Sequence, residues 1–358
     1  IGTNAAGTAA IGNGRGDSDA ANVFGNGNLI GGAAPGEGNL ISGNLGDALD
    51  VFGPGNVIQG NFIGTNAAGT ALLRNGGTGL QVGNSSQFGP APPSRVGGTQ
   101  PGERNVISGN RIGIIAFGSE DVIQGNFIGT DITGTVALGN LIDGIFLIGN
   151  RHLIGGTAPG AGNLISGNRR FGILVASSGA DGGHRIQGNR IGTKADGASA
   201  LGNASDGVAF ATDFFVGSSG TGPVDSLIGG IESGAGNVIA FNRQGVNLLA
   251  GRRIGILSNS IFSNGQLGID LNGDNPTAND AGDADTGDNE LQNFPVVSEA
   301  VSDGSRTNIT GALNSIPNAG FFLQFFASDF GDPSGFGEGQ RLLGTHAVLT
   351  DGSGNASF

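Results

Sequence analysis

The hexapeptide Asn-Leu-Ile-Ser-Gly-Asn at 39–44 recurs along the chain with small changes, and this repetition limits the possible folds more than any other feature. A chain built from copies of one short strand uses a single structural unit many times. Each copy places apolar residues between Asn and Gly, which are turn-forming residues. The further copies are NVIQGN at 56–61, NVISGN at 105–110, DVIQGN at 121–126, NLISGN at 163–168, HRIQGN at 184–189, NVIAFN at 237–242 and NSIFSN at 259–264.

The copies belong to a longer period. The tripeptide Ile-Gly-Thr begins at residues 1, 63, 128 and 191, in steps of 62, 65 and 63 residues. Between these signals apolar residues alternate at period 2, as Leu49/Val51 and Ile173/Val175 do, which indicates strands with one buried face. Such repeats bury their apolar faces only by stacking, so each period predicts two coils of roughly 25–30 residues in a solenoid.

The asparagine that closes each hexapeptide is expected to lie at one corner of successive coils. Asn tolerates left-handed backbone angles and bonds to its local backbone, so it suits a corner. Stacked amides also hydrogen-bond along a ladder. We therefore assign a structural role, rather than a ligand-binding one, to Asn44, Asn61, Asn110, Asn126, Asn168, Asn189, Asn242 and Asn264.

The pattern N-[LV]-I-[SQ]-G-N, with IGT-[ND]-x-x-G-T and x-I-G-G-T-x-P-G-x-G-N between copies, resembles the right-handed parallel β-helix repeat of large bacterial surface and secreted proteins. The resemblance covers residues 1–272. It implies an all-β fold, a right-handed parallel β-helix, and a location that is extracellular or at the cell surface. The fold also houses pectate-lyase-like and polygalacturonase-like enzymes, so it does not by itself select a function.

Composition excludes several classes of function. Of 358 residues, 74 are Gly, and because they mark turns in a repeat we expect order rather than low complexity. The net charge of −13 argues against a nucleic-acid partner, since phosphate binding needs basic clusters. There is no Cys, and hence no disulfide or thiolate metal site. No apolar run reaches the length that a membrane span requires.

Composition changes near residue 270, where seven acidic residues fall within 270–290. Oxygen side chains at alternate positions suit Ca²⁺, which takes six to eight oxygen ligands. The spacing is not that of an EF-hand. The alternative is a solvated acidic linker over 273–291, but we favour Ca²⁺ because so many neighbouring acids repel one another without a counterion. The expected ligands are Asp270, Asn272, Asp274, Asp280, Asp283, Asp285 and Asp288.

Residues 292–358 predict a small antiparallel β-sandwich, because short alternating runs are separated by turn residues. The segment also resembles the Ig-like module that often follows these β-helix repeats. Both chain ends are expected to leave strand edges unsatisfied, which predicts either truncation from a larger polypeptide or head-to-tail assembly. The residues concerned are Ile1, Gly2 and Thr3 at one end, and Asn355, Ala356, Ser357 and Phe358 at the other.

No catalytic residue is assigned. Asp47, Asp143 and Asp206 occupy equivalent places before a strand, and such repetition favours a structural turn over a catalytic pair. His152 and His184 replace Asn before a strand, so we expect them at corners. The tripeptide Arg15-Gly16-Asp17 matches an integrin-type motif and is attributed to chance.

The sequence therefore favours an extracellular structural or interaction protein, either a subunit of a head-to-tail filament or a rod-like segment of a surface adhesin. The alternative is a carbohydrate-active enzyme or a carbohydrate-binding module of pectate-lyase-like type. The expected partners are other copies of the chain and a surface polysaccharide, and the expected cofactor is Ca²⁺.

Overall fold

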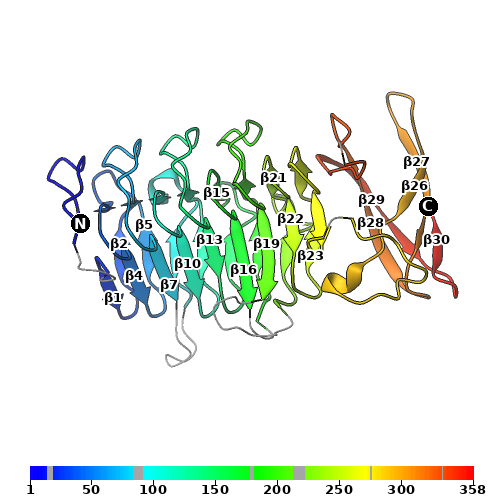
Figure 1. Ribbon diagram of the computed structural model, residues 1–358, viewed down its shortest axis with the longest axis horizontal. Helices are drawn as coiled ribbons and strands as arrows, with labels where there is room; N and C mark the ends of the chain where they lie inside the picture. Colours follow the sequence, from blue (N-terminus) through cyan, green and yellow to red (C-terminus); the bar gives the residue numbers. More distant parts are fainter. Residues whose placement is uncertain (14–18, 84–91, 178–180, 213–221, 275, 333) are drawn as a thin grey trace.

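The computed structural model describes residues 1–13, 19–83, 92–177, 181–212, 222–274, 276–332 and 334–358, so Arg15-Gly16-Asp17 lies outside the described residues. Three long parallel sheets wind around one core, and two small antiparallel sheets follow (Figure 1). The predicted fold class, a parallel β-helix followed by a small antiparallel sandwich, is confirmed. Within the described ranges, no helix has the length and apolar character needed to cross a bilayer.

Each coil gives one short strand to each sheet in turn. Sheet 1 contains β1 (Asn22–Phe24), β4 (Leu49–Phe52), β7 (Leu80–Gly83), β10 (Ile114–Phe117), β13 (Ile145–Leu147), β16 (Ile173–Ser177), β19 (Val208–Thr212), β22 (Val246–Leu248) and β25 (Ile269–Leu271). Sheet 2 contains β2 (Leu29–Gly31), β5 (Val57–Gln59), β8 (Arg95–Gly97), β11 (Val122–Gln124), β14 (Leu153–Gly155), β17 (Arg185–Gln187), β20 (Leu227–Gly229) and β23 (Gly255–Leu257). Sheet 3 contains β3 (Leu40–Ile41), β6 (Phe62–Ile63), β9 (Val106–Ile107), β12 (Phe127–Ile128), β15 (Leu164–Ile165), β18 (Arg190–Ile191), β21 (Val238–Ala240) and β24 (Ser260–Phe262). A short 3₁₀ helix, η2 (Pro101–Glu103), lies between β8 and β9.

The core consists of columns of equivalent residues, because the parallel strands pair in register. In sheet 2, Val96 pairs with Ile123, which pairs with Ile154, and all three side chains are fully buried. Burying each such side chain contributes about 1.5–3 kcal/mol. Because a one-residue slip would turn every inward side chain outward, this core fixes the register along the whole solenoid.

The two-coil module is visible as a hairpin that projects from every second coil (Figure 1, top). The hairpins are closed by antiparallel bridges between Thr3 and Ala10, Thr65 and Leu72, Thr130 and Ala137, and Thr193 and Ala200. These are the Ile-Gly-Thr segments of the sequence period, so that period corresponds to two coils.

The C-terminal region forms two small sheets around their own core. One contains β26 (Val296–Ser302), β27 (Thr307–Asn314) and β30 (Asn355–Ser357), and the other contains β28 (Gly320–Ala327) and β29 (Arg341–Leu349). Leu313, Leu323, Val348 and Ala356 are buried between them. The 3₁₀ segment η3 (Asp288–Leu291) lies between the solenoid and this sandwich.

The last four residues are paired on one side, contrary to the prediction that they leave a strand edge wholly unsatisfied, and β30 is the outer strand of its sheet. β30 pairs with β27, and Phe358 and Gly311 exchange two backbone hydrogen bonds of 3.0 Å. The sequence did not reveal this pairing, because the partner strand lies about forty residues earlier and carries no repeat signal.

Candidate functional site

Each corner of the solenoid carries a column of polar side chains that bond from coil to coil. The first corner, between sheets 1 and 2, holds Asn28, Asn56, Ser94, Asp121, His152, His184 and Ser226. The second corner, between sheets 2 and 3, holds Asn39, Asn61, Asn105, Asn126, Asn163, Asn189, Asn237 and Asn259. The third corner, between sheet 3 and the next strand of sheet 1, holds Asn44, Asn75, Asn110, Asn140, Asn168, Asn203, Asn242 and Asn264.

The prediction that the closing asparagines share one corner is wrong. They alternate between two corners: Asn61, Asn126 and Asn189 lie at the second, and Asn44, Asn110, Asn168, Asn242 and Asn264 at the third. The hexapeptide forms a strand of sheet 3 in some copies and of sheet 2 in others. Since an asparagine stands at either end of most copies, their sequences do not distinguish the two placements.

Sequence reasoning missed three members of the third corner. Asn75, Asn140 and Asn203 close no hexapeptide, yet they bond within the same column. The signal that could have found them is a second recurrence, in which Asn follows Ala-Leu-Gly at 137–140 and 200–203, and Ala-Leu-Leu-Arg at 71–75.

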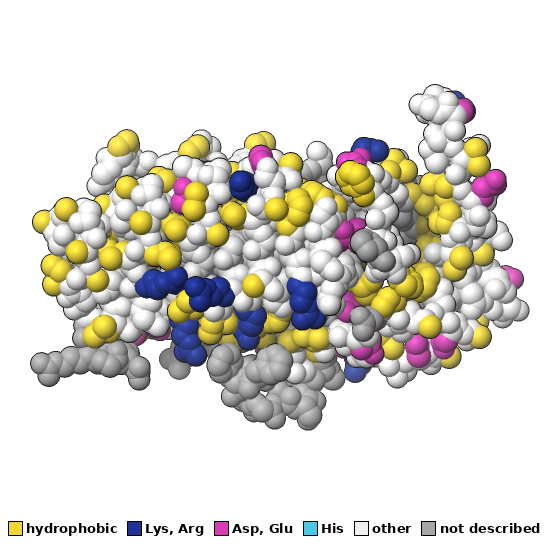
Figure 2. Space-filling model, turned by 45° about the horizontal axis from the view of Figure 1, so that its top comes forward, with side chains coloured by type: hydrophobic (Ala, Val, Ile, Leu, Met, Phe, Trp, Pro, Cys, Tyr) yellow, Lys and Arg dark blue, Asp and Glu magenta, His cyan; other side chains and the backbone are white. Residues whose placement is uncertain are grey.

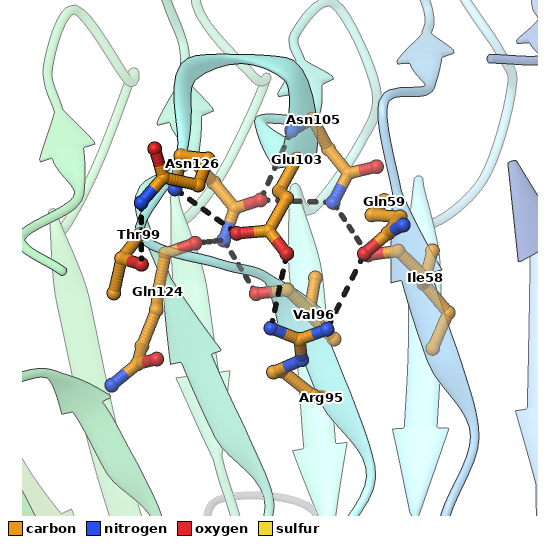
Figure 3. A network of polar contacts seen from close by, with 10 residues as sticks. Ile58, Gln59, Arg95, Val96, Thr99, Glu103, Asn105, Gln124 and Asn126 are labelled. Atoms are coloured by element: carbon orange, nitrogen blue, oxygen red, sulfur yellow. Dashed lines mark hydrogen bonds and ion pairs between the residues drawn. The ribbon is translucent and has the colours of Figure 1, made fainter. Parts of the chain in front are cut away.

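The second corner shows how the amides are satisfied (Figure 3). The Nδ2 of Asn126 donates to the carbonyl oxygens of Val96 and Gln124, at 2.9 Å each, while its Oδ1 accepts from Nδ2 of Asn105 at 2.9 Å. Beside it, Arg95 donates to Glu103 at 3.3 Å. An amide suits this place because it donates and accepts at once, so each one satisfies the backbone of its own coil and the side chain of the next.

At the first corner two histidines replace asparagine. The rings of His152 and His184 stack with centroids 5.4 Å apart, and both are buried. Nδ1 of His152 accepts from the backbone N–H of Asp121 at 3.2 Å, which requires an unprotonated Nδ1. Burial lowers the pKa of His152 to about 4, and burial, followed by the neighbouring His152, lowers that of His184 to about 3. The column therefore requires neutral imidazoles.

The sandwich and the acidic segment cover the last coil and place one polar side chain at each corner. At the first corner Asn289 accepts from the N–H of Ile254 at 2.7 Å and donates to its carbonyl at 2.8 Å. Beside the second corner Gln324 accepts from the N–H of Ser258 at 2.9 Å. At the third corner the Glu338 carboxylate accepts from Nδ2 of Asn264 at 2.8 Å and from its N–H at 3.2 Å. We call Asn289, Gln324 and Glu338 the capping residues.

The backbone of the last solenoid strand is covered as well. The N–H of Ile261 in β24, the last strand of sheet 3, donates to the carbonyl of Gly339 at 2.9 Å. An apolar cavity of about 510 Å³ remains between the last coil and the sandwich, lined by residues that include Ile261, Leu267, Phe325 and Phe336. At the other end Ile1 stacks in register, because its carbonyl accepts from Ser42 as that of Ile63 does from Ser108.

The three equivalent aspartates each bond to a neighbouring coil. Asp47 accepts from the N–H of Thr78 at 2.6 Å. Asp143 forms a bidentate pair with Arg170, and Asp206 accepts from Nδ2 of Asn247 at 2.8 Å. These bonds stabilise the stack and do not bring two of the carboxylates together.

Arginines form a row along the third corner, and Figure 2 shows Lys and Arg side chains gathered along the solenoid. Arg111, Arg169 and Arg243 each directly follow a third-corner asparagine, so they recur at every second coil, about 10 Å apart. Arg74 lies close enough that the charge of Arg169, after burial, lowers its pKa. Among the described residues, no acid forms an ion pair with Arg74, Arg111 or Arg169.

The acidic segment brings together only three of the seven predicted calcium ligands. Carboxylate oxygens of Asp280, Asp283 and Asp285 lie within 4.8 Å of one another. Oδ1 of Asp285 is buried without a hydrogen-bond partner among the described residues. Burial, together with the charges of Asp280 and Asp283, raises the pKa of Asp285.

The other four predicted ligands make separate contacts. Asp270 is buried in β25 and accepts from Nε2 of Gln244. Asn272 donates to Asp274 at 3.0 Å, and Asp288 accepts from the N–H of Gly251 at 3.0 Å. The segment 273–291 is thus docked by specific bonds, unlike a freely solvated linker.

No protein-family model matches the chain, and no curated protein does.

Proposed function

We propose that the protein is a rod-like structural or interaction element outside the cell, either a subunit of an end-to-end filament or a segment of a surface adhesin. The observation that carries this proposal is the continuity of the three polar corners, which bond each coil to the next over the length of the solenoid. The aspartates that a glycosidase would use are engaged in these coil-to-coil contacts. These polar side chains therefore support a structural role, which is to hold the coils together, rather than a catalytic one.

Electron microscopy of the purified protein over a range of concentrations tests this proposal. We expect straight rods that join end to end as the concentration rises, with Phe24 and Leu29 of the first coil, 75% and 62% exposed, in the contact. The double variant Phe24→Asp/Leu29→Asp should remain as single rods, whereas Phe330→Asp, at an equally exposed residue of the sandwich, should associate as the wild type does. Rods that never join, in any of the three proteins, would contradict the filament and leave the adhesin segment.

A second candidate function, binding of an acidic polysaccharide, is favoured by the arginine row. In a chain of net charge −13, Arg74, Arg111 and Arg169 lie along one corner with no ion pair to any described acid, and Arg111 and Arg169 are two coils apart. A linear polyanion lying along the solenoid axis would meet a charge at each module.

Polygalacturonate is a suitable probe for this second candidate. We expect salt-sensitive binding that Arg111→Gln/Arg169→Gln weakens at least tenfold, while Arg306→Gln, in the exposed turn between β26 and β27, does not. Equal binding by both variants would exclude the row as the site. Release of reducing ends from the polymer would instead identify an enzyme and contradict the structural proposal.

We also propose that Ca²⁺ binds at Asp280, Asp283 and Asp285. The supporting observation is the buried, unpaired oxygen of Asp285 beside two further carboxylates. An ion there would stiffen the segment that carries Asn289 to the first corner. Calorimetric titration should show saturable Ca²⁺ binding that Asp285→Asn removes and exposed Asp329→Asn retains. Unchanged binding in Asp285→Asn would overturn this assignment.

A further inference from the structure

A second group of carboxylates lies at the opposite end of the molecule. Oxygens of Asp19, Asp47 and Asp50 lie within 4.8 Å of one another. We propose that these three residues form a separate binding site for a hard divalent cation of the Ca²⁺ type, which ties the first coil to the second. The inference does not rest on the rod proposal, because it depends only on the local arrangement of these acids.

The fold places the three acids together on the outer face of sheet 1. Asp50 lies in β4 between Leu49 and Val51, which point into the core, so its own side chain points outward. Asp47 precedes the same strand, and Asp19 precedes β1 on the coil before. Two backbone bonds hold the coils in place here, from the N–H of Ala20 to the carbonyl of Asp47 at 2.7 Å and from the N–H of Asp50 to Ala21 at 2.9 Å.

The observation that points to a ligand is an unsatisfied oxygen. Asp50 is only 5% exposed, and its Oδ1 is buried without a hydrogen-bond partner among the described residues. Its Oδ2 accepts one long bond, of 3.5 Å, from Nε2 of Gln81. An isolated buried carboxylate oxygen is costly, so such a group normally gains a proton or a cation.

Within the described part of the chain, these three carboxylates have no cationic partner. None of the ion pairs formed by described residues includes Asp19, Asp47 or Asp50. Burial, then the charges of Asp19 and Asp47, raises the pKa of Asp50 to about 7.

The oxygen-only donor set selects the class of cation. The three side chains offer carboxylates without His or Cys, which disfavours Zn²⁺ and Cu²⁺ and favours Ca²⁺, Mg²⁺ or Mn²⁺. Ca²⁺ accepts irregular geometry and completes its six to eight ligands with water, whereas Mg²⁺ demands a near-ideal octahedron. Carboxylates fixed on two different coils suit the more tolerant ion.

The test is a titration of the full chain with Ca²⁺, and with Tb³⁺ as a luminescent substitute, at pH 8.0. We expect Asp50→Asn to lower the number of bound ions by one relative to the wild type, and Asp285→Asn to leave this site occupied. Asp19→Asn, at a less buried position, provides a second variant and should weaken the same site at least tenfold. Asp329→Asn, outside both groups of acids, is the control.

Hydrogen exchange locates the ion independently of stoichiometry. Saturating Ca²⁺ should slow exchange at 20–24 and 48–52 in the wild type and in Asp285→Asn, but not in Asp50→Asn or Asp19→Asn. If those two variants bind the same number of ions as the wild type, the proposal is overturned. It is equally overturned if Ca²⁺ leaves exchange at 20–24 unchanged in the wild type, because the ion then does not tie the first coil to the second.

Discussion

At the scale of single residues, the stability of the solenoid depends on side-chain amides that donate a hydrogen bond to one neighbouring coil and accept one from the other. Asn168 donates through Nδ2 to Oδ1 of Asn203 at 2.9 Å, and its own Oδ1 accepts from Nδ2 of Asn140 at 2.9 Å. It is 1% exposed, so water cannot replace either partner. Each amide therefore stabilises two coils at once, and loss of one leaves unsatisfied groups on both sides.

Substitution of one ladder asparagine should be much more costly than substitution of an exposed one. We expect Asn168→Ala to lower the free energy of unfolding by about 2–4 kcal/mol, because it leaves more than one buried polar group unpaired. Asn168→Asp should also destabilise the protein, since a carboxylate would face the Oδ1 of Asn203. Urea unfolding checks both, with Asn308→Ala on exposed β27 as the control; equal midpoints would contradict the ladder's contribution.

The stacked histidines should make stability depend on pH. Their pKa values, about 4 and about 3, lie below the value of about 6.5 in an unfolded chain. The folded state thus disfavours the proton, so their stabilisation is complete above pH 6.5 and declines as pH falls from 6.5 towards 4. Between pH 7.5 and 5.5 the pair should lose on the order of 2 kcal/mol.

The double variant His152→Asn/His184→Asn isolates this effect. Asp50 and Asp121, whose pKa values are raised to about 7, gain stability as pH falls through 7 and act in the opposite direction. These acids remain in the variant, so the difference between the two unfolding curves reports the histidines. Asparagine already occupies this corner at Asn28 and Asn56. An equal pH dependence in both proteins would show that the histidines do not titrate as argued.

The sequence predicted the chemistry of these residues better than their position. Asn at the corners and histidine in place of Asn follow from turn preferences and from the repeat. The division of the asparagines between two corners does not, because Asn44 and Asn61 close hexapeptides that differ little. Only the pairing of β3 with β6 and of β5 with β8 distinguishes them.

At the scale of elements, the decisive contact is the sandwich on the last coil. The loop before β29 supplies Glu338 to Asn264, and β28 supplies Gln324 to Ser258. The first is 74 residues away in sequence and the second 66, and neither lies in the repeat. This explains why the repeat, and the alternating runs after it, predicted the two structural units but could not predict the contact between them.

Removal of the glutamate should open the third corner locally. Glu338→Ala removes the acceptor of the Asn264 N–H and one acceptor of its Nδ2, which keeps its bond to the Ile239 carbonyl, so we expect a loss of about 1–3 kcal/mol and faster amide exchange at 261–264. Exposed Glu299→Ala on β26 is the matched control. If exchange at 261–264 matches in the two variants, the carboxylate is not the group that closes this column.

At the scale of the whole molecule, the capping residues determine whether another strand can add to the last coil of the solenoid. A parallel stack offers the same donors and acceptors at its last coil as between any two coils, and here the capping residues occupy them. The overall form, a solenoid followed by a sandwich, was predictable because the sequence shows both the repeat and the alternating runs that follow it. The docking of the acidic segment was not, because acids at alternate positions describe a solvated linker and a folded loop equally well.

Substitution of two capping residues together should expose the last coil of the solenoid and promote association between molecules. At the same protein concentration, we expect Gln324→Ala/Glu338→Ala to associate more than the wild type does, because Ser258 and Asn264 lose hydrogen-bond partners. Sedimentation velocity measures this, with Glu299→Ala/Glu338→Ala as the control that keeps Gln324. A double variant that sediments as the wild type would show that the apolar contacts of the sandwich suffice to protect the edge.

The alternation of the hexapeptide between sheets 2 and 3 constrains how the gene could lengthen or shorten. Copies at 39–44 and 56–61 are similar enough to misalign, but they form strands of different sheets on consecutive coils. A crossover between them would rotate all following strands by one face and bring hairpins, arginines and corner amides out of line. A crossover between copies on the same face of alternate coils, such as 105–110 and 163–168, adds or removes one whole two-coil module. Insertions and deletions that keep the coils aligned are therefore expected to measure about 63 residues, the spacing at which Ile-Gly-Thr recurs.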